Sequence, residues 1–401
     1  MGFHDILHRL AASPVALDLS TGSPLVPPEL RNVLRAGLRD LADDDQRDVV
    51  LSSYTQLDGL DEFREEIAGL MSEQYGRRVC RAEVIAVPGI QAALHYLHRW
   101  LTAQGRRALY PIGLEFAGAV DRTSPHHPAV GPYMMVPADD GTWRPVIDVT
   151  AIRDWSGVGA VILSRPHSPT GRDWSTGELT ALAAAAADCD ALLVLDETYA
   201  PPFAPITDED RPPVDAPNVV RLFSMSKLGL AGERVGVAVA SAEVVHELSR
   251  LQRSFIIQSP KVGQFLTMHL LRAFRAQPSL REIVVSAYRL RWEAGRGAVE
   301  EVGVSGLRVA KWEGGLFLWM EWNGGPTDGE VADALLAQDI AVMPGTALVV
   351  VHERRSVSHP QGLRIGLGAP PEAVALAARA AATLVSARRA TPCAMRAGSD
   401  A

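Results

Sequence analysis

The stretch "SMSKLGLAGERVG", residues 224–236, directly follows the apolar run "NVVRLF" and has an unusual local composition. It contains two serines, three glycines, a lysine and an arginine. Serine hydroxyls, a guanidinium and backbone amides that glycine leaves accessible together form a cradle for a phosphate group. We therefore expect Ser224, Ser226 and Arg234 to bind a phosphate.

Lys227 lies inside this stretch, at the end of an apolar strand. A lone lysine at a strand end is usually an ordinary exposed charge. A lysine in a partly desolvated site instead has a lowered pKa and can form a Schiff base. The neighbouring hydroxyls, guanidinium and glycines favour the second interpretation.

Asp196 ends the apolar strand "LLVLD", residues 192–196, so its carboxylate needs a partner. That partner could be a helix N-terminus or a cation of a salt bridge. A lysine beside a phosphate site, with an aspartate from a neighbouring strand, also matches what pyridoxal 5'-phosphate (PLP) requires. The lysine holds the aldehyde, and the aspartate keeps the pyridine nitrogen protonated. Tyr199, three residues on, is close enough to address the same bound group.

Strand and helix patterns alternate around these residues. The run "EVIAVPG", residues 83–89, predicts a strand and a glycine turn, and a helix pattern follows over residues 90–101. Ser175 and Glu178 predict a capping box at the start of another helix. Continuous apolar strands such as "GAVILS" are typical of a mainly parallel sheet covered by helices on both faces. In such sheets, ligands bind at the carboxyl ends of the strands.

The length of 401 residues predicts one large domain and a smaller one. We place the large α/β domain at residues 50–270 and a smaller α+β domain at residues 271–387. The N-terminal segment, residues 1–49, should join the small domain. The small, polar residues 388–401 should form a disordered tail.

Composition excludes several classes of partner. A net charge of -8 without a long basic run argues against nucleic acid as a partner. The sequence contains no run of about 18 apolar residues, so no membrane span is predicted. The three cysteines have no metal-ligand spacing and their odd number argues against a disulfide framework, so we expect a reducing cytoplasm. The histidines, including His126 and His127, show no ligand spacing, and no metal is expected.

The sequence resembles the class I/II aminotransferases of PLP fold type I, and within them is most similar to the valine-pyruvate (alanine-valine) transaminase group. The matching segments run from about residue 18 to 368. They are "SRPHSPTG", "LLVLDETYAPPF", "SMSKLGLAGERVG", "GGLFLWMEW", "VMPG" and "GLRIGLG". The resemblance implies a large domain with a mainly parallel, seven-stranded sheet and a homodimer that shares its active sites.

The resemblance also implies roles for the residues already singled out. Lys227 would carry PLP as a Schiff base and move the substrate proton. Asp196 would pair with the pyridinium, and Tyr199 would hydrogen-bond the ring 3'-oxygen. The phosphate would be held by the two serines and arginine of the opening stretch and by backbone amides at Gly89 and Ile90.

Four further positions match the family pattern. Phe116 would stack on the cofactor ring, and Arg364 would grip the substrate α-carboxylate. Tyr54 would be lent to the partner's phosphate site, and Gly22 lies in the segment that covers the substrate. Taken alone, Phe116 and Tyr54 could be core residues, and Arg364 could be a surface charge on an edge strand.

Two positions depart from the pattern. Ser168 stands before "PTG", where the family has an asparagine that contacts both the ring oxygen and the substrate carboxylate. Serine is shorter and carries one hydroxyl, so it should not span both contacts. Ile90 stands where the related group has a hydroxyl residue, so the phosphate loses one side-chain donor there.

Our first functional hypothesis is an aminotransferase that moves an α-amino group between an amino acid and a 2-oxo acid. The alternative keeps the cofactor but changes the outcome to elimination, replacement or cyclisation on an unusual substrate, including S-adenosylmethionine-type γ-chemistry. Ser168 motivates this alternative. A third hypothesis, a PLP-dependent regulator without catalysis, is disfavoured because the roughly 50 residues before the large domain carry no basic patch.

Overall fold

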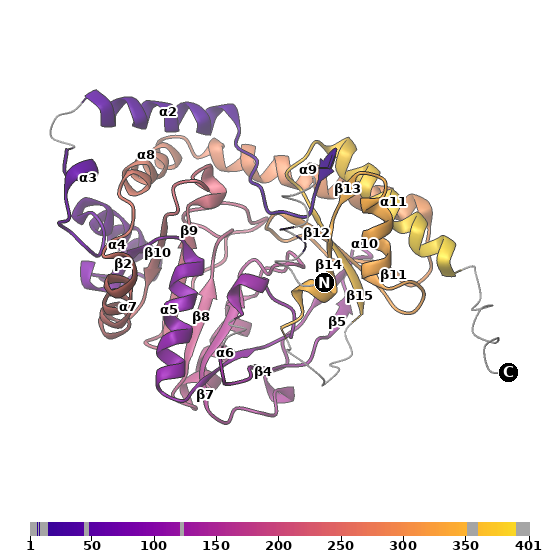
Figure 1. The fold of residues 1–401 in the computed structure, drawn as a ribbon, viewed down its shortest axis with the longest axis horizontal. Coiled ribbons are helices and arrows are strands. Elements are labelled where there is room, and N and C mark those ends of the chain that lie inside the picture. The colour runs from indigo at the N-terminus through magenta and orange to yellow at the C-terminus, as the bar shows by residue number, and fades with distance from the viewer. Residues whose placement is uncertain are drawn as a thin grey trace.

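The computed structural model describes residues 6, 8, 15–43, 48–120, 124–350 and 360–389. A seven-stranded sheet forms the centre of the large domain, with the strand order β2-β10-β9-β8-β7-β3-β4 (Figure 1). Its strands are β2 (Val84–Val87), β3 (Arg107–Tyr110), β4 (Ala129–Val130), β7 (Val158–Ser164), β8 (Leu192–Asp196), β9 (Val219–Ser224) and β10 (Gly236–Val239).

The sheet is mainly parallel, as the sequence predicts. Strands β9, β8, β7, β3 and β4 pair in parallel, whereas β10 runs antiparallel to both of its neighbours, β9 and β2. Every residue of β2, β7, β9 and β10 is buried, which explains their continuous apolar character. The register aligns Ser164 with Asp196, so the carboxyl ends of β7 and β8 meet at one edge.

Helices cover both faces of this sheet (Figure 1). Side chains of α5 (Ile90–Ala103) and α7 (Ala242–Ile256) share an apolar core with one face. The other face packs against α4 (Asp61–Tyr75), α8 (Val262–Ala276) and, farther along the sheet, α6 (Thr176–Ala187). The expected capping box at α6 is confirmed, because Ser175 and Glu178 satisfy each other's backbone amides.

A smaller antiparallel sheet forms the second domain. Its strand order is β11-β12-β15-β14. The strands are β11 (Leu307–Val309), β12 (Phe317–Trp322), β14 (Met343–Pro344) and β15 (Gln361–Gly366). The helices are α9 (Ser279–Val302), α10 (Asp328–Leu336) and α11 (Pro371–Arg389), and α9 packs along α11.

The N-terminal segment contacts both domains. Strand β1 (Leu17–Asp18) pairs with β13 (Ile340–Ala341) of the small domain. Helix α2 (Pro28–Asp43) packs on α8 of the large domain, and α3 (Asp48–Ser52) follows. The remaining strands, β5 (Met135–Pro137) and β6 (Trp143–Pro145), form a separate hairpin.

Two sequence expectations concern the ends and surfaces of the chain. Helix α11 continues to Arg389, so the first residues of the predicted tail are helical, and residues 390–401 lie outside the described part. Among the described helices, none combines the length and apolar character needed to cross a bilayer. The described residues also contain no cluster of three or more histidine, cysteine, aspartate or glutamate side chains that could hold a metal ion.

Candidate active site

A cavity of about 280 Å³ lies at the carboxyl ends of the large sheet, close to the lower limit of small-molecule sites. All residues predicted for the site line this cavity, except Gly89 and Tyr54. Seven further residues that the sequence did not single out also line it. They are Thr21, Gln91, Leu94, Ser164, Thr198, Ala231 and Phe317.

One end of the cavity is suited to an anion. Helix α5 begins at Ile90, and because its N-cap residue is Gly89, no N-cap side chain hydrogen-bonds the backbone amides of its first turn. A Cβ atom at Gly89 would lie 2.7 Å from the Arg234 guanidinium, so glycine is what lets Arg234 approach this helix N-terminus. Arg234 also lies 3.4 Å from the Ser226 hydroxyl. Helix N-terminus, guanidinium and hydroxyl therefore converge, as a phosphate requires.

Lys227 lies between the two domains. Its Nζ donates a hydrogen bond to the Gly22 carbonyl at 2.6 Å and sits 6.0 Å from the centre of the Tyr199 ring. Burial, with a smaller contribution from the like charge of Arg364, lowers the pKa of Lys227 to about 8, against the opposing effect of Asp196. Roughly a quarter of such an amine is neutral at pH 7.5, against about 0.1% of an ordinary lysine.

This lowered pKa gives a direct prediction for the cofactor-free protein. The rate at which acetic anhydride labels Lys227 should rise with pH and level off above about 8, because only the neutral amine is nucleophilic. Peptide mass spectrometry at a series of pH values measures this rate. Free N-acetyl-lysine amide in the same solution is the control, and as an ordinary lysine it should keep gaining reactivity towards pH 10. A Lys227 profile like that of the free lysine amide would contradict the assignment.

Asp196 is buried, and Thr198 holds its carboxylate. The Thr198 amide and hydroxyl both donate to Asp196 Oδ1, at 3.0 and 2.5 Å. Burial raises the pKa of Asp196, while these two hydrogen bonds and the charge of Lys227 act in the opposite direction. Both described hydrogen bonds end on Oδ1, which leaves the second oxygen for a ligand in the cavity.

Thr198→Val should therefore weaken cofactor binding about tenfold, since a hydrogen bond to a charged group contributes about 1.5–3 kcal/mol. Valine keeps the shape and the amide but removes the hydroxyl. Titration of the cofactor-free variant with PLP, followed by tryptophan fluorescence, measures the change. Thr198→Ser keeps the hydroxyl and should bind as the unchanged protein does. Equal affinity in the valine variant would refute the role of this hydroxyl.

Arg364 lies on β15, with a side chain that is buried rather than at the surface. Its Nη2 donates to the Ser20 carbonyl at 2.8 Å, and its guanidinium stacks 4.0 Å above the Phe317 ring. Burial lowers the pKa of Arg364 to about 10. Its Nε has no hydrogen-bond partner, and no carboxylate pairs with it in the part of the chain that the structure describes. Such a buried cation is suited to a ligand carboxylate.

Ser168 supplies a second unsatisfied group on the same cavity. Its hydroxyl is buried without a hydrogen-bond partner, while its amide donates to the Ser164 hydroxyl at 2.9 Å. Buried polar groups are normally paired, so unpaired ones that line a cavity indicate a polar ligand. The cavity thus offers an anion site, a reactive amine, a carboxylate and two unsatisfied polar groups. This set fits PLP together with an amino acid.

Two predicted site residues do not line the cavity. Gly89 adjoins the cavity through its contact with Arg234. Tyr54 is 76% exposed, so the alternative that it is a core residue is wrong. Phe116 is only partly buried and lines the cavity, as a residue that covers a cofactor would.

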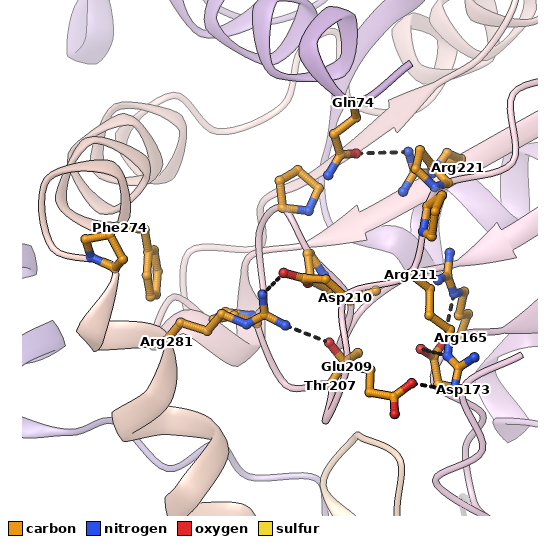
Figure 2. A pocket seen from close by; sticks show the side chains of 17 residues that line it. Gln74, Arg165, Asp173, Thr207, Glu209, Asp210, Arg211, Arg221, Phe274 and Arg281 are labelled. Atoms are coloured by element: carbon orange, nitrogen blue, oxygen red, sulfur yellow. Dashed lines mark hydrogen bonds and ion pairs between the residues drawn. The ribbon is translucent and has the colours of Figure 1, made fainter. Parts of the chain in front are cut away.

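A larger cavity of about 500 Å³ lies near the start of α9 and contains none of the predicted site residues (Figure 2). Four arginines line it, but each already has a carboxylate partner. The pairs are Arg165 with Asp173 and Glu197, Arg211 with Asp173 and Glu209, Arg221 with Glu197, and Arg281 with Asp210. Prolines form much of the remaining wall. The paired charges make this cavity poorly suited to a charged substrate.

Comparison with known proteins identifies the family of this chain. The sequence profile of the family "Aminotransferase class I and II" matches residues 15–380. The chain belongs to the class I and II aminotransferases. It is therefore a PLP-dependent transferase, and the predicted fold class is confirmed.

Relatives within the family are distant in sequence. Valine–pyruvate aminotransferase of Escherichia coli (strain K12) is 24% identical over 83% of this chain and 82% of that protein. A probable aspartate/prephenate aminotransferase of Thermus aquaticus is 25% identical over 79% of this chain and 80% of its own length. The solved structure of valine-pyruvate aminotransferase from Salmonella typhimurium LT2 has a TM-score of 0.84 at 21% identity and covers 97% of this chain and 100% of its own. A putative amino-acid aminotransferase from Psychrobacter arcticum 273-4 reaches 0.89 at 20% identity, covering 98% and 97%.

Different side chains of this aminotransferase would bind the cofactor, transfer the proton and orient the substrate. When bound, PLP supplies an aldehyde and an electron-accepting ring. Arg234, Ser226 and the α5 N-terminus would hold its phosphate, and Asp196 would hold a proton at its ring nitrogen. Lys227 would remove and return the proton at the substrate Cα atom, since its lowered pKa makes the neutral amine accessible near neutral pH. Arg364 would orient the substrate through its carboxylate.

Proposed function

We propose that this aminotransferase uses α-amino acids with an uncharged side chain and the matching 2-oxo acids. The small number of positively charged side chains that line the cavity supports this substrate class. Among the described residues, those that line the cavity and carry positive charge are Lys227, Arg234 and Arg364. These three are suited to the carbonyl, the phosphate and the α-carboxylate, so no described cation remains for a second substrate carboxylate.

The rest of the cavity wall supports the same substrate class. Leu94, Phe116, Ala231 and Phe317 are apolar, and Thr21 and Gln91 are neutral. A neutral wall does not compensate the cost of burying a charged side chain. The name of the Escherichia coli relative, valine–pyruvate aminotransferase, agrees with a neutral side chain.

A panel of amino acids tests this proposal. Valine, alanine, leucine and methionine should convert the bound cofactor to its amine form and release a 2-oxo acid, whereas aspartate, glutamate and lysine should react at least about 100-fold more slowly. Absorbance of the enzyme and chemical detection of the 2-oxo acid measure both products. Preference for a dicarboxylic amino acid would overturn the proposal.

Elimination, replacement or cyclisation is a second candidate, favoured by Ser168. Its buried, unpaired hydroxyl stands where relatives have an asparagine, so the contact that joins ring and carboxylate is reduced. Membership of the aminotransferase family supports transamination instead. The same measurements, with S-adenosylmethionine added to the panel, separate the two. Elimination, replacement and cyclisation all leave the aldehyde form of the cofactor intact, and elimination also releases ammonia.

We also propose that the enzyme is a homodimer. Several large apolar side chains are exposed together: Leu51, Tyr54, Phe255, Ile256 and Ile257. The segments that carry them are adjacent, since Gln258 and Lys261 both donate to the Ser53 carbonyl, at 3.2 and 2.8 Å. A contiguous exposed apolar patch is typical of a protein–protein interface. Tyr54 lies within it, as a residue lent to a partner would.

Leu51→Asp should therefore shift the enzyme towards monomer, because it places a charge in the proposed interface. The side chain is 67% exposed, so the fold of the single chain should not change. Size-exclusion chromatography with light scattering measures the mass. Leu376→Asp, on the exposed face of α11 at 57% exposure, is the control and should leave the dimer intact. A monomeric parent protein, or a dimeric Leu51→Asp variant, would refute this interface.

A further inference from the structure

Glu115 is a fully buried carboxyl group directly behind the cofactor cavity, and neither the family pattern nor the mechanism uses it. Its Oε1 accepts hydrogen bonds from the Phe116 amide at 2.8 Å and the Ser164 hydroxyl at 2.6 Å. Its Oε2 accepts from the Ser164 amide at 2.8 Å. Phe116 and Ser164 both line the cavity, so one carboxyl group fixes two segments of its wall.

The contacts extend to a third wall residue. The Ser164 hydroxyl, held by Glu115, accepts the Ser168 amide at 2.9 Å. Ser168 is the position where serine replaces the asparagine of the family. A shorter side chain depends more on where its backbone lies, and here that backbone is anchored through Ser164 to Glu115.

We propose that Glu115 is a positioning residue that holds Phe116, Ser164 and Ser168 in place around the cofactor. This inference depends on PLP binding and is independent of which amino acid the enzyme uses. Glu115 does not touch the substrate; it acts through the residues that line the cavity.

Burial and the nearby charge of Asp196 favour the neutral form of Glu115. In the described part of the chain, its one ion-pair contact is with His167, whose Nε2 lies 4.0 Å from Oε2. Burial lowers the pKa of His167 to about 4, so this imidazole carries no charge at neutral pH. Burial, with a smaller contribution from the charge of Asp196, raises the pKa of Glu115 to about 8, although its hydrogen bonds from Ser164 and Phe116 act in the opposite direction. The mainly neutral group thus adds little negative charge beside Asp196.

Paired substitutions test this role with PLP titrated into the cofactor-free enzyme. Glu115→Gln keeps one carbonyl oxygen for the Phe116 amide and the Ser164 hydroxyl, but its NH2 group cannot accept from the Ser164 amide. It should therefore weaken cofactor binding less than about tenfold and change the visible circular dichroism less than the leucine variant does. Glu115→Leu leaves the Phe116 amide and both Ser164 donors unpaired. It should weaken binding about tenfold to a hundredfold and alter the dichroism even at saturation.

Glu321→Leu is the matched control, because Glu321 is another buried, hydrogen-bonded carboxyl group but lies outside the cavity, on β12. It should lower the melting temperature and leave cofactor affinity and dichroism unchanged. If Glu115→Leu does not fold, Ser164→Ala replaces it and should give the same spectral change. Parent-like affinity and dichroism in the Glu115→Leu or Ser164→Ala variant would overturn the proposal, and so would a Glu115→Gln variant as impaired as the leucine variant.

Discussion

Lys227→Ala is expected to lose transamination by about 10⁴-fold or more, because it removes both the attachment point of the cofactor and the base that moves the Cα proton. Lys227 is the one lysine that lines the cavity in the described part of the chain. Steady-state kinetics with the best amino acid of the panel measure the loss. The variant should still bind PLP through Arg234 and the α5 N-terminus, but without a covalent bond.

Lys311→Ala controls for the loss of a lysine elsewhere and should keep full activity. Methylamine added to the Lys227→Ala variant offers a second control, because a free amine can replace part of the missing proton transfer. Turnover of the alanine variant within about tenfold of the parent enzyme would exclude Lys227 as the base.

Asp196→Asn should lower kcat by about 10³-fold, as expected when a preorganised charge at the reacting centre is removed. Asparagine has the same shape and can still accept the Thr198 hydrogen bonds through its carbonyl oxygen. It carries no negative charge, so it cannot keep a proton on the ring nitrogen. Steady-state kinetics measure the fall in kcat, and the absorption spectrum of the PLP-loaded enzyme reports the protonation of the ring nitrogen.

The control for Asp196→Asn is Asp173→Asn, at another buried carboxylate. Asp173 pairs with Arg165 at 2.8 Å outside the active-site cavity. Its substitution should reduce the free energy of unfolding and leave kcat within about twofold. If Asp196→Asn also keeps kcat within about tenfold, the charge at position 196 does not support the chemistry.

Much of the fold could be predicted from the sequence because each signal was local. The capping box of Ser175 and Glu178 and the apolar runs of β7 and β8 lie within a few residues each. The direction of β10 could not be predicted, because parallel and antiparallel buried strands have the same apolar pattern. Strand direction depends on how the chain connects in space.

The candidate site shows the same division. Residue types identified Lys227 and Asp196, since a cation or carboxylate beside an apolar strand needs a partner, whereas Arg364 followed only from the resemblance to the family. Glu115 could not be identified, because its partner Ser164 is 49 residues away in the chain. The contact between Arg364 and Ser20 spans 344 residues. Such contacts follow from the packing of segments that lie far apart in the sequence, which no local pattern encodes.

Borohydride reduction of the PLP-loaded enzyme, followed by peptide mass spectrometry, tests whether Lys227 holds the cofactor. We expect a yellow enzyme whose colour is lost on reduction, with the cofactor fixed to the peptide that contains Lys227. Absence of a fixed cofactor, or its attachment to Lys261 or Lys311 instead, would contradict this expectation.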